Sequence, residues 1–249
     1  MLEPYRKTML LRSCDADFNG RWRPGAVFTA MQEAGEDHAS RLGFGFSDLR
    51  AQNLCWVLSR ASLEMARYPE LGEEIQIVTW PEKARHTVFP RMYMFFDANG
   101  NLYGRAASLW VLMDIETRQM VHPAARGLSM PEVAGLEGAL PIPGGLCKMD
   151  GAEETRITRY PVYTDLDVNG HVNNAKYIDW LSNALPVRRH REGCFRSILI
   201  HYMAETLPDE AVELTLSQKE STVALSGAQK GQMHFALRAV WQDNGKAPQ

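Results

Sequence analysis

The sequence predicts an α+β protein made of two similar units, each with one long helix packed on an antiparallel sheet. Three observations support this prediction: a loop motif that occurs twice, an amphipathic helical segment after each copy, and several alternating, strand-like segments after each helix. The chain has 249 residues, which is enough for two domains of about 120 residues each. We therefore expect one unit over residues 1–125, a linker over 126–149 and a second unit over 150–249.

The duplicated motif is a loop rich in Asp, Asn and Gly. The segment CDADFNGRWRPGAVFTAMQEA, which begins at Cys14, aligns without a gap with TDLDVNGHVNNAKYIDWLSNA, which begins at Thr164. The two aspartates, the asparagine and the glycine of the loop coincide in both copies. Such a match indicates an internal duplication, so the two halves should share one fold.

Each loop leads into a predicted helix, over residues 26–43 in the first half and 174–190 in the second. The apolar positions that share one helical face are Val27, Met31 and Ala34 in the first helix, and Tyr177, Leu181 and Leu185 in the second. Gly43 is expected to end the first helix, and Pro186 to perturb the second near its end.

Strand-like segments follow both helices. They cover 73–80, 87–97 and 101–114 in the first half, and 197–205, 211–220, 221–229 and 232–242 in the second. Ala98-Asn99-Gly100 is typical of a hairpin turn. Residues 122–145 are rich in Pro, Gly and Ala and are expected to connect the halves with little regular structure beyond one helical turn. One helix wrapped by an antiparallel sheet is the layout of the hotdog fold, so the sequence predicts a tandem (double) hotdog.

The start of the second loop, DLDVNG at 165–170, is also how an EF-hand calcium loop begins. An EF-hand needs a bidentate Glu at loop position twelve and a helix on each side. That position holds Lys176, and Pro161 stands where the entering helix would lie. We therefore expect no calcium, and no other metal or cofactor. The loop should instead enter the helix, with Asn173 or Asn174 near its N-cap.

The segment DVNGHVNNAKYIDW (167–180) closely resembles the signature of the acyl-acyl carrier protein (acyl-ACP) thioesterases of plants and bacteria. In the first half, RYPELGEEIQIVTWPE and ASLWVLMDIETRQMVHP are similar to the same family, and the resemblance covers nearly the whole chain. Members of the family are tandem hotdog proteins that hydrolyse the thioester of acyl-ACP. The resemblance implies a hydrolase that ends fatty acid synthesis by releasing free fatty acid and holo-ACP.

The resemblance also implies a set of catalytic residues. In the family, the Asp, Asn and His of a D-x-N-x-H motif are implicated in catalysis, and they match Asp167, Asn169 and His171. A downstream Glu of the family matches Glu205, in a predicted strand after the helix. The plant enzymes have Cys after that Glu, whereas this chain has Thr206, which excludes a thiol nucleophile at this position.

Thioester hydrolysis needs an activated water and a stabilised oxyanion. We expect Glu205 to act as the general base, with Asn169 helping to hold the water. His171 and the backbone after it would polarise the carbonyl, and Asp167 would orient the loop or His171. The roles of Asp167 and Glu205 could be exchanged. The alternative is that Asp167 and Asn169 only form an Asx-type turn.

The first copy of the motif lacks the His and the Glu of the second. Arg21 aligns with His171, and Tyr68 falls at the place of Glu205, so we expect the first unit to be catalytically degenerate. By resemblance, this unit holds the acyl chain between its helix and its sheet. The candidate acyl-binding residues are Val27, Phe28, Met31, Leu42, Phe44 and Trp56. For each of them the alternative is ordinary core packing.

Composition and charge limit the classes of partner. Apolar residues make up 45% and charged residues 23% of the chain, and the net charge of −3 favours neither nucleic acid nor a charged membrane. The first ten residues carry charges and no long apolar stretch, so we expect neither a signal peptide nor a plastid transit segment nor a membrane span, and a cytoplasmic location. The cysteines are scattered without a C-x-x-C pair and are expected to be free thiols: Cys14, Cys55, Cys147 and Cys194.

Two other functions remain open. An acyl-CoA thioesterase would use the same chemistry, and a non-catalytic hotdog protein would bind acyl groups without cleaving them. Such regulators usually carry a DNA-binding module, which no segment of the predicted layout supplies, and His171 together with Glu205 favours catalysis. The partner implied by the resemblance is acyl carrier protein bearing an acyl-phosphopantetheine. A tandem hotdog imitates a hotdog dimer within one chain, so a monomer would suffice, and a homodimer is the alternative.

Overall fold

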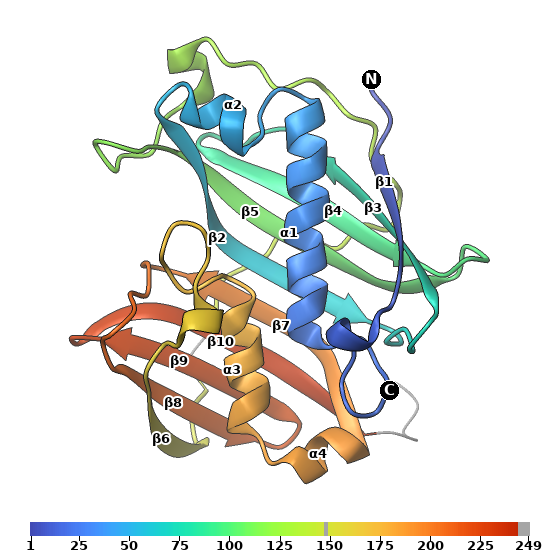
Figure 1. Ribbon diagram of the computed structural model, residues 1–249, viewed down its shortest axis with the longest axis vertical. Helices are drawn as coiled ribbons and strands as arrows, with labels where there is room; N and C mark the ends of the chain where they lie inside the picture. The colour runs from blue at the N-terminus through green and yellow to red at the C-terminus, as the bar shows by residue number, and fades with distance from the viewer. Residues whose placement is uncertain (147–148, 244–249) are drawn as a thin grey trace. The chain divides into compact units, whose positions relative to one another are not determined.

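The computed structural model describes residues 1–146 and 149–243 (Figure 1). Its internal contacts divide the chain into two compact units, Met1–Pro143 and Gly144–Gln249. Residues 147–148 of the predicted linker, which include Cys147, and residues 244–249 of the predicted second unit lie outside the described residues. Within the described residues, no helix is both long enough and apolar enough to cross a membrane.

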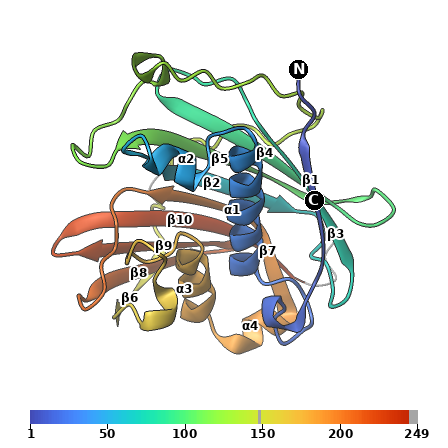
Figure 2. The ribbon, with the colours of Figure 1, turned by 45° about the horizontal axis from the view of Figure 1, so that its top comes forward.

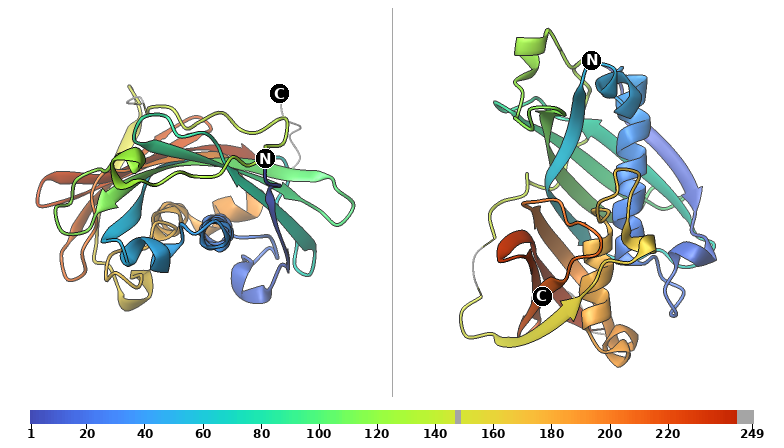
Figure 3. Two further views of the ribbon diagram at one scale, coloured as in Figure 1. Left: turned by 90° about the horizontal axis from the view of Figure 1, so that it is seen from above. Right: turned by 60° about the vertical axis from the view of Figure 1, so that its left-hand side comes forward.

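In the first unit a curved antiparallel sheet lies against one long helix (Figures 1 and 3). The order of its strands across the sheet is β1 (Tyr5–Leu10), β3 (Glu74–Pro81), β4 (Val88–Phe96), β5 (Leu102–Asp114) and β2 (Leu54–Met65). The helix α1 (Pro24–Arg41) is followed by the short α2 (Phe46–Arg50). A 3-10 turn over Pro123–Arg126 provides the helical turn expected in the connecting segment.

The ends and the packing of α1 follow from particular residues. Pro24 occupies the first turn, where its missing N–H costs no hydrogen bond. Gly43 has φ +79° directly after the C-cap Leu42, the left-handed conformation that ends helices, as the sequence predicts. A Cβ on Gly35 would lie 2.9 Å from the Tyr93 hydroxyl, so the absence of a side chain lets α1 approach the sheet closely.

The second unit repeats this plan with a shorter helix lying on its sheet (Figure 2). The order of its strands is β7 (Gly193–Tyr202), β10 (Gln232–Asp243), β9 (Thr222–Gln229), β8 (Val212–Lys219) and β6 (Glu153–Arg159). All paired strands within this unit are antiparallel, as they are in the first.

The single helix predicted over 174–190 is instead two helices, α3 (Lys176–Ala184) and α4 (Val187–Glu192). Leu185 has extended backbone angles because the ring of a following proline disfavours the helical conformation, and Pro186 forms the N-cap of α4. Leu185 still belongs to the buried core. The proline therefore divides the helix and does not merely bend it.

Three strands, β1, β2 and β6, are missing from the sequence-based prediction. β1 and β6 each lie at the edge of the sheet of their own unit, and the side chains of β6 (EETRITR) are mostly exposed, so β6 has no apolar alternation to detect. In β2 the pairing register with β5 shifts between Leu58 and Arg60. Such a bulge interrupts the period-2 pattern by which strands are recognised.

A buried polar cluster lies between α1 and the sheet of the first unit. Arg91 Nη1 lies 3.1 Å from His38 Nδ1 and 3.4 Å from Thr79 Oγ1. Burial lowers the pKa of His38 to about 4, and the positive charges of Arg91 and Arg41 contribute in the same direction. His38 is therefore neutral at pH 7 and acts as a buried hydrogen-bonding residue of the first unit.

We expect the protein to lose stability on acidification through this histidine. The pKa of His38 rises from about 4 in the folded chain to its ordinary value of 6.5 on unfolding, so the unfolded state binds the extra proton and stability falls as the pH drops from 6.5 towards 4. The loss should be about 1–2 kcal/mol after allowance for screening by solvent. Thermal melts of wild type and His38→Gln between pH 4 and 7 check this, and an equally steep pH dependence in both proteins would contradict it.

Candidate active site

The loop of the second unit is shaped by the carboxylate of Asp167. Its Oδ1 accepts hydrogen bonds from the backbone N–H of Asn169 at 2.8 Å and of His171 at 3.4 Å. Gly170 has φ +78°, and its N–H donates to the Asp167 carbonyl at 3.0 Å. The Asx-type turn considered from the sequence therefore forms, and Asp167 serves at least to hold the backbone before His171.

The loop of the first unit has the same construction. Asp17 Oδ1 accepts the N–H groups of Asn19 at 2.8 Å and Arg21 at 3.0 Å, and Gly20 has φ +76°. The turn is thus common to the half with a histidine and the half without one. What distinguishes the second loop is the side chain presented after the turn, His171 in place of Arg21.

His171 and Glu205 come together in the second unit although they are far apart in sequence. The Nε2 of His171 lies 3.5 Å from Oε2 of Glu205, and the two side chains are 27% and 39% exposed. The backbone N–H of Val172 donates to the Thr206 carbonyl at 3.0 Å, which holds the two segments together. An imidazole and a carboxylate that face each other and remain accessible can share a water or a substrate oxygen.

The other predicted site residues have different surroundings. Asn169 is exposed, and its backbone N–H donates to Asp167 Oδ1. Glu205 does not lie in a strand, contrary to the prediction, because β7 ends at Tyr202, where the Met203 and Ala204 N–H groups both donate to the His234 carbonyl. That irregular segment gives the Glu205 side chain its exposure.

The backbone after His171 was expected to polarise the substrate carbonyl, but its N–H groups are largely used within the fold. Val172 donates to the Thr206 carbonyl, Asn173 donates to the Asp165 carbonyl, and Ala175 donates to Asn173 Oδ1. An N–H that already donates is not available to an oxyanion. The N-cap of α3 is Ala175, and the side chain of Asn173 accepts the hydrogen bond from its N–H.

Asp165, the first carboxylate of the calcium-like sequence, is buried. Its Oδ2 lies 3.1 Å from Arg159 Nη2 and accepts the N–H of Val162 at 3.1 Å. The carboxylate thereby ties the loop to the end of β6. Within residues 1–146 and 149–243, no group of three or more His, Cys, Asp or Glu side chains is placed to hold a metal ion.

Two residues next to the pair are not among the predicted site residues. His234, on β10, lies with Nδ1 3.2 Å from the hydroxyl of Thr206. Tyr177, expected only as a core residue, hydrogen-bonds Thr206, and burial with the nearby Asp167 and Glu205 charges raises the pKa of its phenol to about 12. His234 could not be found by pattern because its place depends on the pairing of β10 with β7.

The first unit provides a backbone counterpart of this site. The Trp22 N–H donates to the Pro69 carbonyl at 2.9 Å, as Val172 donates to Thr206. Tyr68, the residue before Pro69, is therefore the structural counterpart of Glu205, in agreement with the sequence alignment, and it is buried. The first unit thus has neither the histidine nor the glutamate at these positions.

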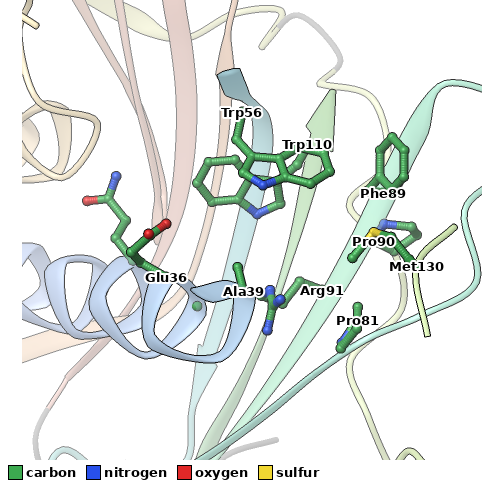
Figure 4. A pocket seen from close by; sticks show the side chains of 11 residues that line it. Glu36, Ala39, Trp56, Pro81, Phe89, Pro90, Arg91, Trp110 and Met130 are labelled. Carbon is green, nitrogen blue, oxygen red and sulfur yellow. The ribbon is translucent and has the colours of Figure 1, made fainter. Parts of the chain in front are cut away.

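A cavity of about 80 Å³ lies between α1 and the sheet of the first unit (Figure 4). Its lining includes Glu36, Trp56, Phe89, Arg91, Trp110 and Met130. Of the predicted acyl-binding residues, Trp56 lines this cavity, and Phe44 belongs to the buried apolar cluster against which Trp56 and Leu42 pack. Val27, Phe28 and Met31 are instead buried in the first half of α1. The cavity is small beside the roughly 300–1,000 Å³ of typical ligand pockets.

Comparison with known protein families identifies the family of this chain. A model of the N-terminal domain of acyl-ACP thioesterases matches residues 3–125, and a model of the C-terminal domain matches residues 149–243. The chain belongs to the acyl-ACP thioesterase family. His171 and Glu205 lie in the part that corresponds to the family's C-terminal domain, and the cavity lies in the part that corresponds to its N-terminal domain.

Individual relatives within the acyl-ACP thioesterase family support this assignment. The chain is 27% identical to an oleoyl-ACP thioesterase of Coriandrum sativum over 89% of its own length and 65% of the relative's. It is 28% identical to a palmitoyl-ACP thioesterase of Arabidopsis thaliana, over 93% of its own length and 58% of the relative's. The chain therefore spans about three fifths of the length of these chloroplast proteins.

Solved structures show the fold of the family. An acyl-ACP thioesterase of Bacteroides thetaiotaomicron superposes with a TM-score of 0.81 at 23% identity, over 96% of this chain and 98% of that one. A 12:0-ACP thioesterase of Umbellularia californica superposes with a TM-score of 0.82 at 25% identity, over 97% of this chain and 98% of that one. The fold is the double hotdog expected from the sequence.

Proposed function

We propose that this chain hydrolyses the thioester of acyl-ACP and releases a free fatty acid and holo-ACP. The observation that carries the proposal is the His171–Glu205 pair, 3.5 Å apart at a partly exposed place in the second unit. Membership of the acyl-ACP thioesterase family supports the substrate class. The partner is accordingly acyl carrier protein bearing an acyl-phosphopantetheine.

Glu205 is the general base in the proposed mechanism. Its carboxylate takes a proton from a water molecule, and the water oxygen attacks the thioester carbonyl carbon. The N–H of the His171 imidazole donates to the carbonyl oxygen as negative charge develops there. Collapse of the tetrahedral intermediate breaks the C–S bond, and the proton held by Glu205 passes to the departing thiolate. Asn169 helps to hold the water, and Asp167 acts through the loop that presents His171.

The first unit binds the acyl chain in this proposal. The cavity beside Trp56 forms part of the acyl-binding site in this proposal. Its aromatic walls come from β2, β4 and β5. The contribution of Val27, Phe28 and Met31 stays a prediction, as does the location of the protein in the cytoplasm. That a monomer suffices, with a homodimer as the alternative, likewise stays a prediction.

Parallel assays with acyl-ACP and acyl-CoA carrying the same acyl group test the substrate class. We expect kcat/KM for acyl-ACP to exceed that for acyl-CoA by about tenfold or more, a difference that needs only about 1.4 kcal/mol of extra transition-state binding from the carrier protein. A preference for acyl-CoA would establish the same chemistry on the other thioester. Tight binding of acyl-ACP without release of fatty acid would instead support a non-catalytic acyl-binding protein.

A further inference from the structure

We propose that Thr206 and His234 form a buried clamp that positions Glu205 opposite His171. The inference rests on the proposed function, because it assigns to both residues a role in the same reaction. Neither residue is proposed to touch the substrate. They act through the main chain that carries the base.

The clamp connects the segment around Glu205 to His234 of β10. The His234 carbonyl accepts the N–H groups of Met203 at 2.8 Å and Ala204 at 3.1 Å. The Nδ1 of the His234 ring lies 3.2 Å from the Thr206 hydroxyl. The backbone just before Glu205 and the side chain just after it therefore contact a single histidine.

Thr206 also connects this segment to the loop that carries His171. Its carbonyl accepts the N–H of Val172 at 3.0 Å, and the buried phenol of Tyr177 on α3 hydrogen-bonds it. Thr206 directly follows Glu205 in the chain, and it is hydrogen-bonded to Val172, the residue that directly follows His171. A displacement of Thr206 would change the 3.5 Å separation of the two catalytic groups, and small changes of that kind lower turnover strongly.

A hydroxyl beside a neutral imidazole also has the composition of a nucleophile and its base. Burial lowers the pKa of His234, so its ring is neutral at pH 7. However, Thr206 is 0% exposed and His234 is 8% exposed, whereas the Glu205 side chain is 39% exposed. An acyl carbon can reach Glu205 but not the Thr206 hydroxyl. The geometry therefore favours a positioning role over nucleophilic attack.

The first unit, which lacks the catalytic residues, shows which of these contacts belong to the fold itself. There the Tyr103 carbonyl accepts the N–H groups of Ala66 at 2.8 Å and Arg67 at 3.2 Å, so Tyr103 is the counterpart of His234. The Tyr103 phenol donates to Glu73 Oε2 at 3.1 Å, and Pro69 stands at the place of Thr206. The backbone arrangement is common to both units, but the hydroxyl–imidazole contact occurs in the unit that carries the base.

Thr206→Val and Thr206→Ser separate positioning from packing, because valine keeps the shape without the hydroxyl and serine keeps the hydroxyl with less volume. On acyl-ACP we expect Thr206→Val to lower kcat by about 10- to 100-fold with KM within about twofold, and Thr206→Ser to stay within about threefold of wild type. The matched control is Tyr103→Phe, which removes a side-chain hydrogen bond in the first unit and should leave kcat unchanged. Wild-type kcat in folded Thr206→Val would overturn the clamp, as would an acyl group trapped on Thr206.

Two further measurements show whether the clamp acts through Glu205. In a Glu205→Gln background, Thr206→Val should cause no further loss of the residual rate, since the base is already absent; a full additional loss would overturn the proposal. The ¹⁵N shifts of the His234 ring should change in Thr206→Val, and unchanged shifts would show that the contact is absent. The NMR measurement needs no thioester, so a wild type that hydrolyses none would refute the proposed function while the contact is still tested.

Discussion

Glu205→Gln is expected to lower turnover of acyl-ACP by about 10²- to 10⁴-fold with little change in folding. The amide keeps the size of the side chain but cannot take a proton from water, and loss of a general base has an effect of this order. Because Glu205 is partly exposed, the substitution leaves the buried core intact. Single-turnover kinetics with thermal melts of the same preparations measure both effects. Wild-type turnover in Glu205→Gln would remove Glu205 from the mechanism and leave Asp167 as the base.

Loss of activity alone does not distinguish a base from a nucleophile, because a carboxylate could attack the thioester and form an anhydride. A single turnover of wild type in ¹⁸O-water separates the two routes. If Glu205 activates water, the label should appear only in the released fatty acid. Label in the Glu205 carboxylate, or an acylated protein detected by mass spectrometry, would show direct attack by the carboxylate.

His171→Ala is expected to lower turnover by about 10²-fold or more, which is the usual effect of losing an acid–base or oxyanion group. Its matched control is Arg21→Ala, at the same position of the first loop. Both loops have the same Asx turn, through Asp17 and Asp167, so both substitutions place alanine after an equivalent backbone. Arg21→Ala should therefore retain most of the turnover as long as the protein is folded.

Comparison of these two variants assigns the catalytic half. Steady-state kinetics on acyl-ACP, with circular dichroism to verify folding, give the required ratio of rates. Equal losses in both variants would mean that the reaction does not depend on the second loop in particular. A larger loss in Arg21→Ala would place the chemistry in the first unit.

Several features of the protein could be predicted because they are local in the sequence. The gapless repeat of the loop predicted two units of the same plan, since an Asx turn before a helix depends on residues only a few positions apart. Gly43 predicted the end of α1 for the same reason. The segments that became β3, β4, β5, β8, β9 and β10 were recognisable because buried residues recur along them, in alternation in β8 and β9 and almost continuously in β4.

The edge strands and the internal organisation of the site were not predictable in this way. β6 is an edge strand with a mostly exposed sequence, and its hydrogen bonds come from β8, far along the chain. The N–H groups after His171 have the right sequence position to bind an oxyanion, but Val172 and Asn173 already donate to Thr206 and Asp165. Whether a backbone group is free depends on its partner, and no local pattern records that partner.

The sequence by itself determined the duplication, the family resemblance and the candidate residues Asp167, Asn169, His171 and Glu205. Only the tertiary structure decided how these residues are used. It directs the Asp167 carboxylate to the loop backbone and brings His171 within 3.5 Å of Glu205. It also places His234 of β10 beside Thr206. The physical reason is that local hydrogen bonds are set by neighbours in sequence, whereas the approach of these groups depends on strand pairing between distant segments.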